Sequence, residues 1–205
     1  MIINKNIVVN IELPIVCERE VLRYAKTDEN DVKSVLLLEE CKKELIPKLK
    51  GTAVYRMADF RIAENECKIG HLKVKSNSLA KAFSGSDYVL LFVATIGIAS
   101  DILVSKYEKI SISKAHIMNS LATERIEAVC DALYEKIERE LFFEGYEITR
   151  RFSAGYGDLD IEFQRDIFKI LTPEKYIGVS LNDSLLMSPS KSVSALIGVK
   201  KTIKQ

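Results

Sequence analysis

The stretch SKAHIMNSLATERIEAVCDALYEKIERELFF, residues 113–143, carries the strongest periodic signal in this 205-residue chain. Its apolar side chains recur every three or four residues: Met118, Ala122, Ile126, Val129, Leu133, Ile137 and Leu141. This spacing predicts one long helix with a stripe that faces a core. Glu127 falls roughly 100° around the helix from Ile126, where the core face turns towards solvent.

The acidic residues of this helix are predicted to form a solvated face: Glu124, Glu127, Asp131 and Glu135. The run YVLLFVATIG, residues 88–97, has a different character, because it is almost uninterrupted apolar sequence. Such a run favours a strand that is buried on both faces and ends at Gly97.

Shorter patterns surround these two elements. Period-two alternation predicts strands over residues 52–59, 67–74, 179–187 and 193–199, with a hairpin across Glu64-Asn65, and an edge strand within 5–16, broken by Pro14. Helices are predicted over 18–25, 31–50, 78–83, 98–107 and 161–171. In the second of these, Asp31 is the expected cap, Gly51 the expected stop, and Pro47 should end regular hydrogen bonding early.

Strands and helices are intermixed without regular strand–helix–strand alternation, so the predicted class is α+β. We expect a single domain over residues 1–205, with a mixed or antiparallel twisted sheet and long helices. No composition shift or linker separates two halves of the chain.

Composition limits the function classes. Thirty Lys and Arg against 29 Asp and Glu leave a net charge of +1, which provides no global field for nucleic acid or a membrane surface. The four cysteines form no CxxC pair, and His71 and His116 are isolated, so no metal site is expected. The N-terminus does not have the pattern of a signal peptide, and the longest apolar run is shorter than a membrane span. We expect a cytoplasmic protein with reduced thiols.

The loop RFSAGYGD, residues 151–158, combines residue types suited to a ligand. Arg can hold a carboxylate through two hydrogen bonds, Gly permits close backbone approach, and Tyr offers a flat face with a polar tip. The same residues are also compatible with an ordinary turn around a buried Tyr. Asp158 and Asp160 are acid–base candidates, although Asp160 fits equally well as the cap of a helix that begins at Ile161. No dinucleotide fingerprint, phosphate loop or nucleophile elbow occurs.

Four ordered segments between residues 79 and 199 resemble the activation domain of cobalamin-dependent methionine synthase and its stand-alone relatives. They are the strand from Asp87 to Gly97, the helix segment LATERIEA at 121–128, the RxxxGY pattern of Arg151, Gly155 and Tyr156, and an SxxMxPxxSVS pattern at 184–194. Residues 1–78 do not resemble the N-terminal part of that domain. Gly157 stands where the family usually has proline, and a family acid six residues before the Arg falls on Gly145.

The resemblance implies a function. In the family, the domain binds S-adenosylmethionine and presents its methyl group to a cobalamin carried by a corrinoid-binding methyltransferase, after a reductant such as a flavodoxin or ferredoxin has supplied one electron. By match, Glu127 would hold the amino-acid or sulfonium end of the ligand, and Arg151 its carboxylate. The backbone around Ala154 and Gly155 would line the pocket, and Tyr156 would lie where ligand and corrin meet.

A general base is not needed for this chemistry, which fits a chain without an evident catalytic dyad, so no catalytic residue is assigned. The leading hypothesis is therefore a stand-alone reactivation module for a methionine-synthase-type partner. Two alternatives stay open: a protein that docks on or caps a corrinoid protein without S-adenosylmethionine chemistry, and a domain of unrelated function that keeps only the fold.

Overall fold

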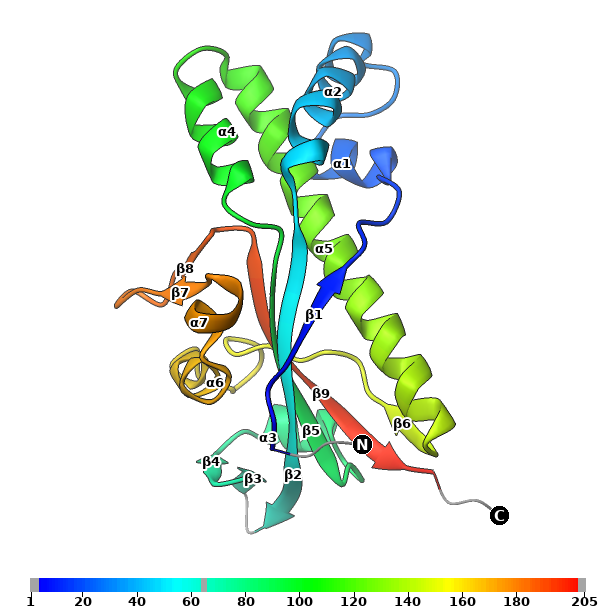
Figure 1. The fold of residues 1–205 in the computed structure, drawn as a ribbon, viewed down its shortest axis with the longest axis vertical. Coiled ribbons are helices and arrows are strands. Elements are labelled where there is room, and N and C mark those ends of the chain that lie inside the picture. The colour runs from blue at the N-terminus through cyan, green and yellow to red at the C-terminus, as the bar shows by residue number, and fades with distance from the viewer. Residues whose placement is uncertain (1–3, 64–65, 203–205) are drawn as a thin grey trace.

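A computed structural model describes residues 4–63 and 66–202 of the chain. Three long antiparallel strands form the centre of its sheet: β2 (Gly51–Ala63), β5 (Tyr88–Thr95) and β9 (Ser192–Lys201). The short strand β6 (Tyr146–Ile148) extends the sheet beyond β9. On the side of β2 away from β5, two strands pair with β2. Its first half pairs with β1 (Ile7–Ile11), and its second half pairs with β3 (Glu66–Ile69). The strand β4 (Leu72–Val74) pairs in turn with β3. Figure 1 shows this arrangement.

Both faces of the sheet are covered, as the apolar run of β5 predicts. Leu90 and Phe92 belong to one core, whereas Leu91 and Val93 belong to the other, because successive side chains of a strand point to opposite faces. The predicted doubly buried strand is confirmed, although it ends at Thr95 rather than Gly97.

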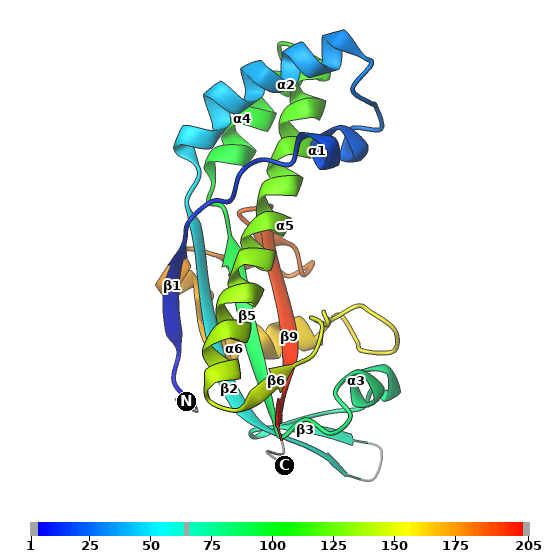
Figure 2. The ribbon, with the colours of Figure 1, turned by 90° about the vertical axis from the view of Figure 1, so that its right-hand side faces the viewer.

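The first core lies beneath α5 (Ile112–Phe143), which crosses one face of the sheet (Figure 2). Its 32 residues give it a length of roughly 48 Å. The helices α1 (Glu18–Tyr24), α2 (Val32–Leu45) and α4 (Ala99–Glu108) pack at its N-terminal end. Every residue of the predicted apolar stripe is buried, so the helix and its orientation are confirmed.

The second core lies on the opposite face of the sheet, under α3 (Asn77–Ala82), α6 (Phe163–Leu171) and α7 (Pro173–Ile177). A separate hairpin of β7 (Ser180–Leu181) and β8 (Met187–Ser188) follows. The mixture of helices with an antiparallel sheet around these two cores confirms the predicted single α+β domain.

Several predicted boundaries differ from the structure. The helix expected over 31–50 is α2, capped by Asp31 as predicted and ending at Leu45, followed by a 3₁₀ turn, Ile46–Lys48. Pro47 lies in that turn, because it lacks the N–H needed to continue the helix. Gly51 is not the helix stop. It begins β2, where an added Cβ would lie 2.7 Å from the carbonyl oxygen of Ile11, so the close approach of β1 requires glycine.

Two further differences arise at turns. The strand expected over 67–74 is divided into β3 and β4 by a turn at Gly70, which has φ +57°. The strand expected over 179–187 is divided into β7 and β8, because Asn182 accepts and donates bonds that close a turn onto Leu186. β6 and α7 were not predicted. The hairpin turn at Glu64-Asn65 lies outside the described residues, whereas the pairing of β2 with β3 on either side of it is antiparallel.

The prediction of a solvated acidic face on α5 is wrong for Glu124, because this residue is buried. Its carboxylate pairs with the buried guanidinium of Arg125, 2.5 Å away, and accepts a hydrogen bond from the backbone N–H of Cys17. Arg125 in turn donates to the carbonyl oxygens of Pro14 and Ile15. The pair therefore anchors the chain between β1 and α1 onto α5.

Candidate functional site

Arg151 is positioned by the edge of the sheet. The chain leaves β6 and returns to β9 at Phe152, which exchanges two backbone hydrogen bonds of 2.8 Å with Leu196. These bonds place Arg151 against α5, where its guanidinium donates a hydrogen bond to the Glu127 carboxylate. The Asp131 carboxylate, one turn further along α5, lies 3.7 Å from the same guanidinium. Two residues predicted to act together are therefore in contact.

The environment of this ion pair is partly desolvated. The side chains of Arg151 and Glu127 are 31% and 37% exposed. Burial lowers the pKa of Arg151, but its hydrogen bond to Glu127 and the charges around it outweigh this effect and leave the pKa raised. Burial also raises the pKa of Asp131; Arg151 opposes this rise, and Glu127 adds to it. The site thus holds a cation between two carboxylates, those of Glu127 and Asp131.

The residues that follow Arg151 form a compact turn. The N–H of Gly155 donates to the carbonyl of Leu159 at 2.8 Å, and Gly155 has φ +87°, a conformation that favours glycine. Ala154 is buried in the second core, whereas Tyr156 is 68% exposed. The Tyr156 ring contacts the edge of Phe152, with 6.5 Å between ring centroids. The turn therefore presents a tyrosine to solvent on a well-packed base, unlike the buried Tyr of the alternative interpretation.

The Glu127–Arg151 pair lies between two hollows. A smaller one, of ≈ 340 Å³, is lined by this pair together with Phe152, Ser153, Tyr156 and Val193. A larger one, of ≈ 500 Å³, is bounded by α5 and by the segment that includes Pro14, Cys17, Glu20 and Tyr24. Both hollows include Glu127 and Arg151, so the ion pair forms part of the wall of each.

The larger hollow carries an excess of negative charge. Its carboxylates outnumber the single guanidinium of Arg151: they are Glu20, Glu124, Glu127, Asp131 and Glu135. Of these, Glu124 is paired with Arg125, Glu20 with Arg23 and Glu127 with Arg151, so the excess negative charge comes from Asp131 and Glu135. This excess of negative charge favours a ligand that carries positive charge.

The structure brings together three of the predicted site residues: Glu127, Arg151 and Tyr156 line the smaller hollow. Ala154 and Gly155 belong to the same turn but are not among the residues that line either hollow. The prediction missed Cys17, Glu20 and Tyr24, because nothing in the sequence indicates that this segment packs against a helix more than a hundred residues later.

The two loop aspartates have structural roles. Asp160 accepts a hydrogen bond of 2.9 Å from the N–H of Glu162, in the turn that precedes α6. The expectation that it caps the following helix is wrong, because α6 begins at Phe163 rather than at Ile161, and its N-cap is Glu162, without a side-chain cap. Asp158 accepts hydrogen bonds from the start of α3. Both carboxylates are thus engaged with their own chain rather than with the hollows.

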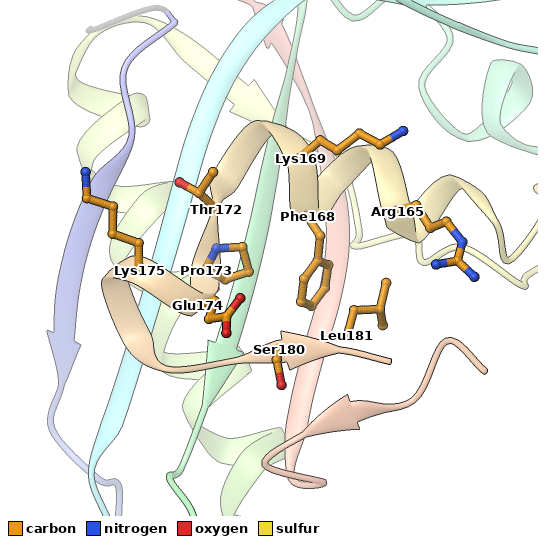
Figure 3. Close-up of a pocket in the computed structure, with 9 residues that line it drawn as sticks. All are labelled: Arg165, Phe168, Lys169, Thr172, Pro173, Glu174, Lys175, Ser180 and Leu181. Atoms are coloured by element: carbon orange, nitrogen blue, oxygen red, sulfur yellow. The ribbon is translucent and has the colours of Figure 1, made fainter. Parts of the chain in front are cut away.

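A third hollow, of ≈ 600 Å³, lies between α6, α7 and β7 on the other side of the molecule (Figure 3). Phe168 and Leu181 line its apolar part, and Lys169 extends away from them. Arg165 at its rim is paired with Glu162 and donates to the carbonyl of Asp183, and Lys169 is paired with Asp166. Two of its cations are therefore committed to their own chain, and the hollow has no converging set of polar groups comparable to the pair of Arg151 and Glu127.

Two further findings concern membrane-spanning helices and metal-binding clusters in the described residues. Within residues 4–63 and 66–202, none of the helices is both long and apolar enough to cross a membrane. The same described ranges contain no group of three His, Cys, Asp or Glu residues placed to hold a metal ion. His116, for example, has its Nε2 atom 2.9 Å from the carbonyl oxygen of Ala25.

Thiol labelling provides a direct test of this site geometry. Cys17, at the larger hollow, is exposed, whereas Cys41, Cys67 and Cys130 are buried. Burial raises the pKa of Cys130 to about 12 and that of Cys41 to about 11, so neither forms the reactive thiolate near neutral pH. We expect iodoacetamide to modify the native protein once, at Cys17, as read by mass spectrometry of peptides. Equal labelling of all four thiols under native conditions would contradict the structure.

Comparison with known proteins identifies the family. The profile described as "Vitamin B12 dependent methionine synthase, activation domain" matches residues 64–204. The chain therefore belongs to this family. The family match begins directly after β2 and includes α5, the turn after Arg151 and β9. A comparison with curated proteins found no match.

Among solved structures, this chain is similar to one described as "Crystal Structure of the MetH Reactivation Domain bound to AdoHcy". The TM-score is 0.70 at 16% sequence identity, and the alignment covers 98% of this chain and 80% of the other. At this identity the likeness concerns the fold. It includes the N-terminal residues that the family profile does not match, and with them α1 and the segment that bounds the larger hollow.

Proposed function

We propose that this protein binds S-adenosylmethionine and presents its methyl group to reduced cobalamin on a partner methyltransferase, as a stand-alone reactivation module for an enzyme of the methionine synthase type. One observation carries the proposal: the pair of Glu127 and Arg151 lines two adjoining hollows next to the exposed Tyr156. Family membership and a structural neighbour described as bound to AdoHcy support it.

The side chains present suit the charges of this substrate. S-adenosylmethionine carries a carboxylate, an ammonium and a positive sulfonium. Arg151 would bind the carboxylate, because a guanidinium forms two parallel bonds with it. Glu127 would bind the ammonium or the sulfonium, and the acidic larger hollow adds a favourable field for a ligand of net charge +1. The hollows share the wall that such a ligand would contact.

Binding requires an exchange of partners. Arg151 and Glu127 are hydrogen-bonded to each other. The ligand carboxylate would replace Glu127 on Arg151, and the ammonium would replace Arg151 on Glu127. Because each group trades one charged partner for another, neither is left buried without compensation. The exchange would also open the wall between the two hollows.

The contribution of the chain to the reaction is orientation. The sulfonium supplies an activated methyl group, and its transfer to reduced cobalt leaves a neutral thioether, so no general base is required. Tyr156, on a turn packed against Phe152, would hold the ligand at the surface that faces the partner. Fixing the methyl group in line with its acceptor is a proximity effect. The electron that reduces the cobalt would come from a reductant such as a flavodoxin or ferredoxin, and the proposed setting is the cytoplasm.

Titration calorimetry tests the ligand half of the proposal. We expect heat of binding with both S-adenosylmethionine and AdoHcy, and a stronger loss of affinity with added salt for the first, because salt screens the attraction of the acidic hollow for the extra positive charge. Ligand should also slow alkylation of Cys17, which lines the larger hollow. Absence of heat at millimolar ligand would reject the proposal.

The methyl-transfer half of the proposal is tested with a purified corrinoid methyltransferase, a reductant and S-adenosylmethionine. The expected result is methyl transfer to cobalamin that depends on this protein. A protein that binds the corrinoid partner without promoting methyl transfer would instead be a docking or capping protein.

A further inference from the structure

Asp158 links the turn of the candidate site to a distant part of the chain. Its Oδ1 accepts hydrogen bonds from Ser76 Oγ at 2.6 Å and from the N–H of Ser78 at 3.0 Å. Its Oδ2 accepts from the N–H of Asn77 at 2.8 Å. These donors belong to the first turn of α3, so a carboxylate eighty residues away in the sequence shares the capping of this helix with Ser76.

Gly157 lets the turn lie directly on α3. It has φ +57°, and an added Cβ would lie 2.4 Å from Ser78 Oγ and 2.6 Å from Ser78 Cβ. Neither a side chain nor the fixed negative φ of proline fits this position. The departure from the family's usual proline is therefore accompanied by a contact that only glycine permits.

The other end of α3 also touches the loop. Phe83, the residue at the end of the helix, contacts the edge of Phe152, with ring centroids 6.3 Å apart, and Phe152 contacts Tyr156. Figure 2 shows the loop after β6 projecting from the sheet next to α3. The Gly155–Tyr156 turn is thus held to α3 through both a charged and an aromatic contact, although α3 lines neither hollow.

We propose that Asp158 is a positioning residue that fixes the Gly155–Tyr156 turn on α3, so that ligand binding at the turn is coupled to the order of α3. This inference rests on the proposed function. The turn contains two glycines with positive φ, at 155 and 157, and such a segment has many accessible conformations when it is not held. Ordering it in advance removes an entropy cost that ligand binding would otherwise carry.

The bonds to Asp158 also keep it charged. The hydrogen bond from Ser76, and then those from the N–H groups of Ser78 and Asn77, hold the pKa of Asp158 well below its usual range. A carboxyl group with a lowered folded-state pKa stabilises the fold above its unfolded pKa and loses this contribution as pH falls through the folded value. Asp158 is therefore ionised and accepts all three hydrogen bonds at neutral and mildly acidic pH, where binding is measured.

The test compares Asp158→Ala and Asp158→Asn with Asp160→Asn, a matched control in the same loop whose carboxylate bonds only to the nearby N–H of Glu162. We expect AdoHcy to bind about tenfold more weakly to Asp158→Ala. Asp158→Asn should fall between this variant and the wild type, because its amide keeps one acceptor oxygen. Asp160→Asn should bind like the wild type.

Hydrogen exchange provides the second readout. In the wild type, AdoHcy should slow exchange of the α3 amides Asn77–Ala82, and this effect should disappear in Asp158→Ala while exchange in β5 stays unchanged, which shows that the variant is folded. Unaltered AdoHcy affinity in Asp158→Ala, or an equal loss in Asp160→Asn, would overturn the inference. If the wild type itself binds no AdoHcy, the proposed function fails instead.

Discussion

Replacing Arg125 with methionine is expected to lower the free energy of unfolding by about 3–5 kcal/mol. Arg125 is among the largest fully buried side chains of the described chain. Its loss would leave the Glu124 carboxylate buried without its cation, and would also leave the carbonyl oxygens of Pro14 and Ile15 without their donors. Breaking a buried pair from one side is strongly destabilising, because the remaining charge cannot be hydrated. Urea unfolding followed by circular dichroism measures the effect.

The helix α5, which contains Arg125, also provides a control. Lys136 and Glu140 form an exposed pair one turn apart, with 2.7 Å between charged atoms. Lys136→Met should change the free energy of unfolding by less than about 1 kcal/mol, because water already solvates both groups. The double variant Glu124→Leu with Arg125→Met should recover much of the lost stability, since no unpaired charge remains. Similar losses for Arg125→Met and Lys136→Met would show that the pair is not buried as described.

Arg151→Ala is expected to weaken AdoHcy binding by about 1.5–3 kcal/mol, the usual contribution of hydrogen bonds to a charged group. This corresponds to roughly a 10–150-fold rise in Kd. The alanine variant cannot engage the ligand carboxylate, and it leaves Glu127 and Asp131 without the cation that both face. Calorimetry with AdoHcy measures the change. Arg151→Lys should restore only part of the affinity, because a single ammonium cannot reproduce two parallel bonds.

Arg150 is the natural control for this prediction. It is the preceding residue, carries the same charge and is exposed, and it lines neither hollow. Arg150→Ala should therefore leave AdoHcy affinity within about twofold of the wild type, since a remote surface charge is screened by salt. An equal loss in both variants would point to net charge alone, and would contradict a specific role for Arg151.

Pattern alone located the residues of the candidate site, whereas only the resemblance to the family assigned Glu127 and Arg151 to a common ligand. Glu127 lies one residue off an apolar stripe, so helix geometry alone places it at the border between core and solvent. Arg151 precedes a turn with two glycines, a pattern suited to close backbone approach. That these two residues touch could not be deduced from spacing, because their contact depends on how the chain after β6 returns to β9 at Leu196.

By itself, the sequence determined the elements: the long amphipathic helix, the doubly buried strand and the short turn after Arg151. Each is encoded locally, because the period of apolar residues and the conformational freedom of glycine are properties of neighbouring residues. Only the tertiary structure decided that Glu124 is buried, that Glu20 and Cys17 border a hollow, and that Asp158 caps α3. These facts depend on which distant segment covers which face, and a helix or a loop carries no local signal for the partner that will desolvate it.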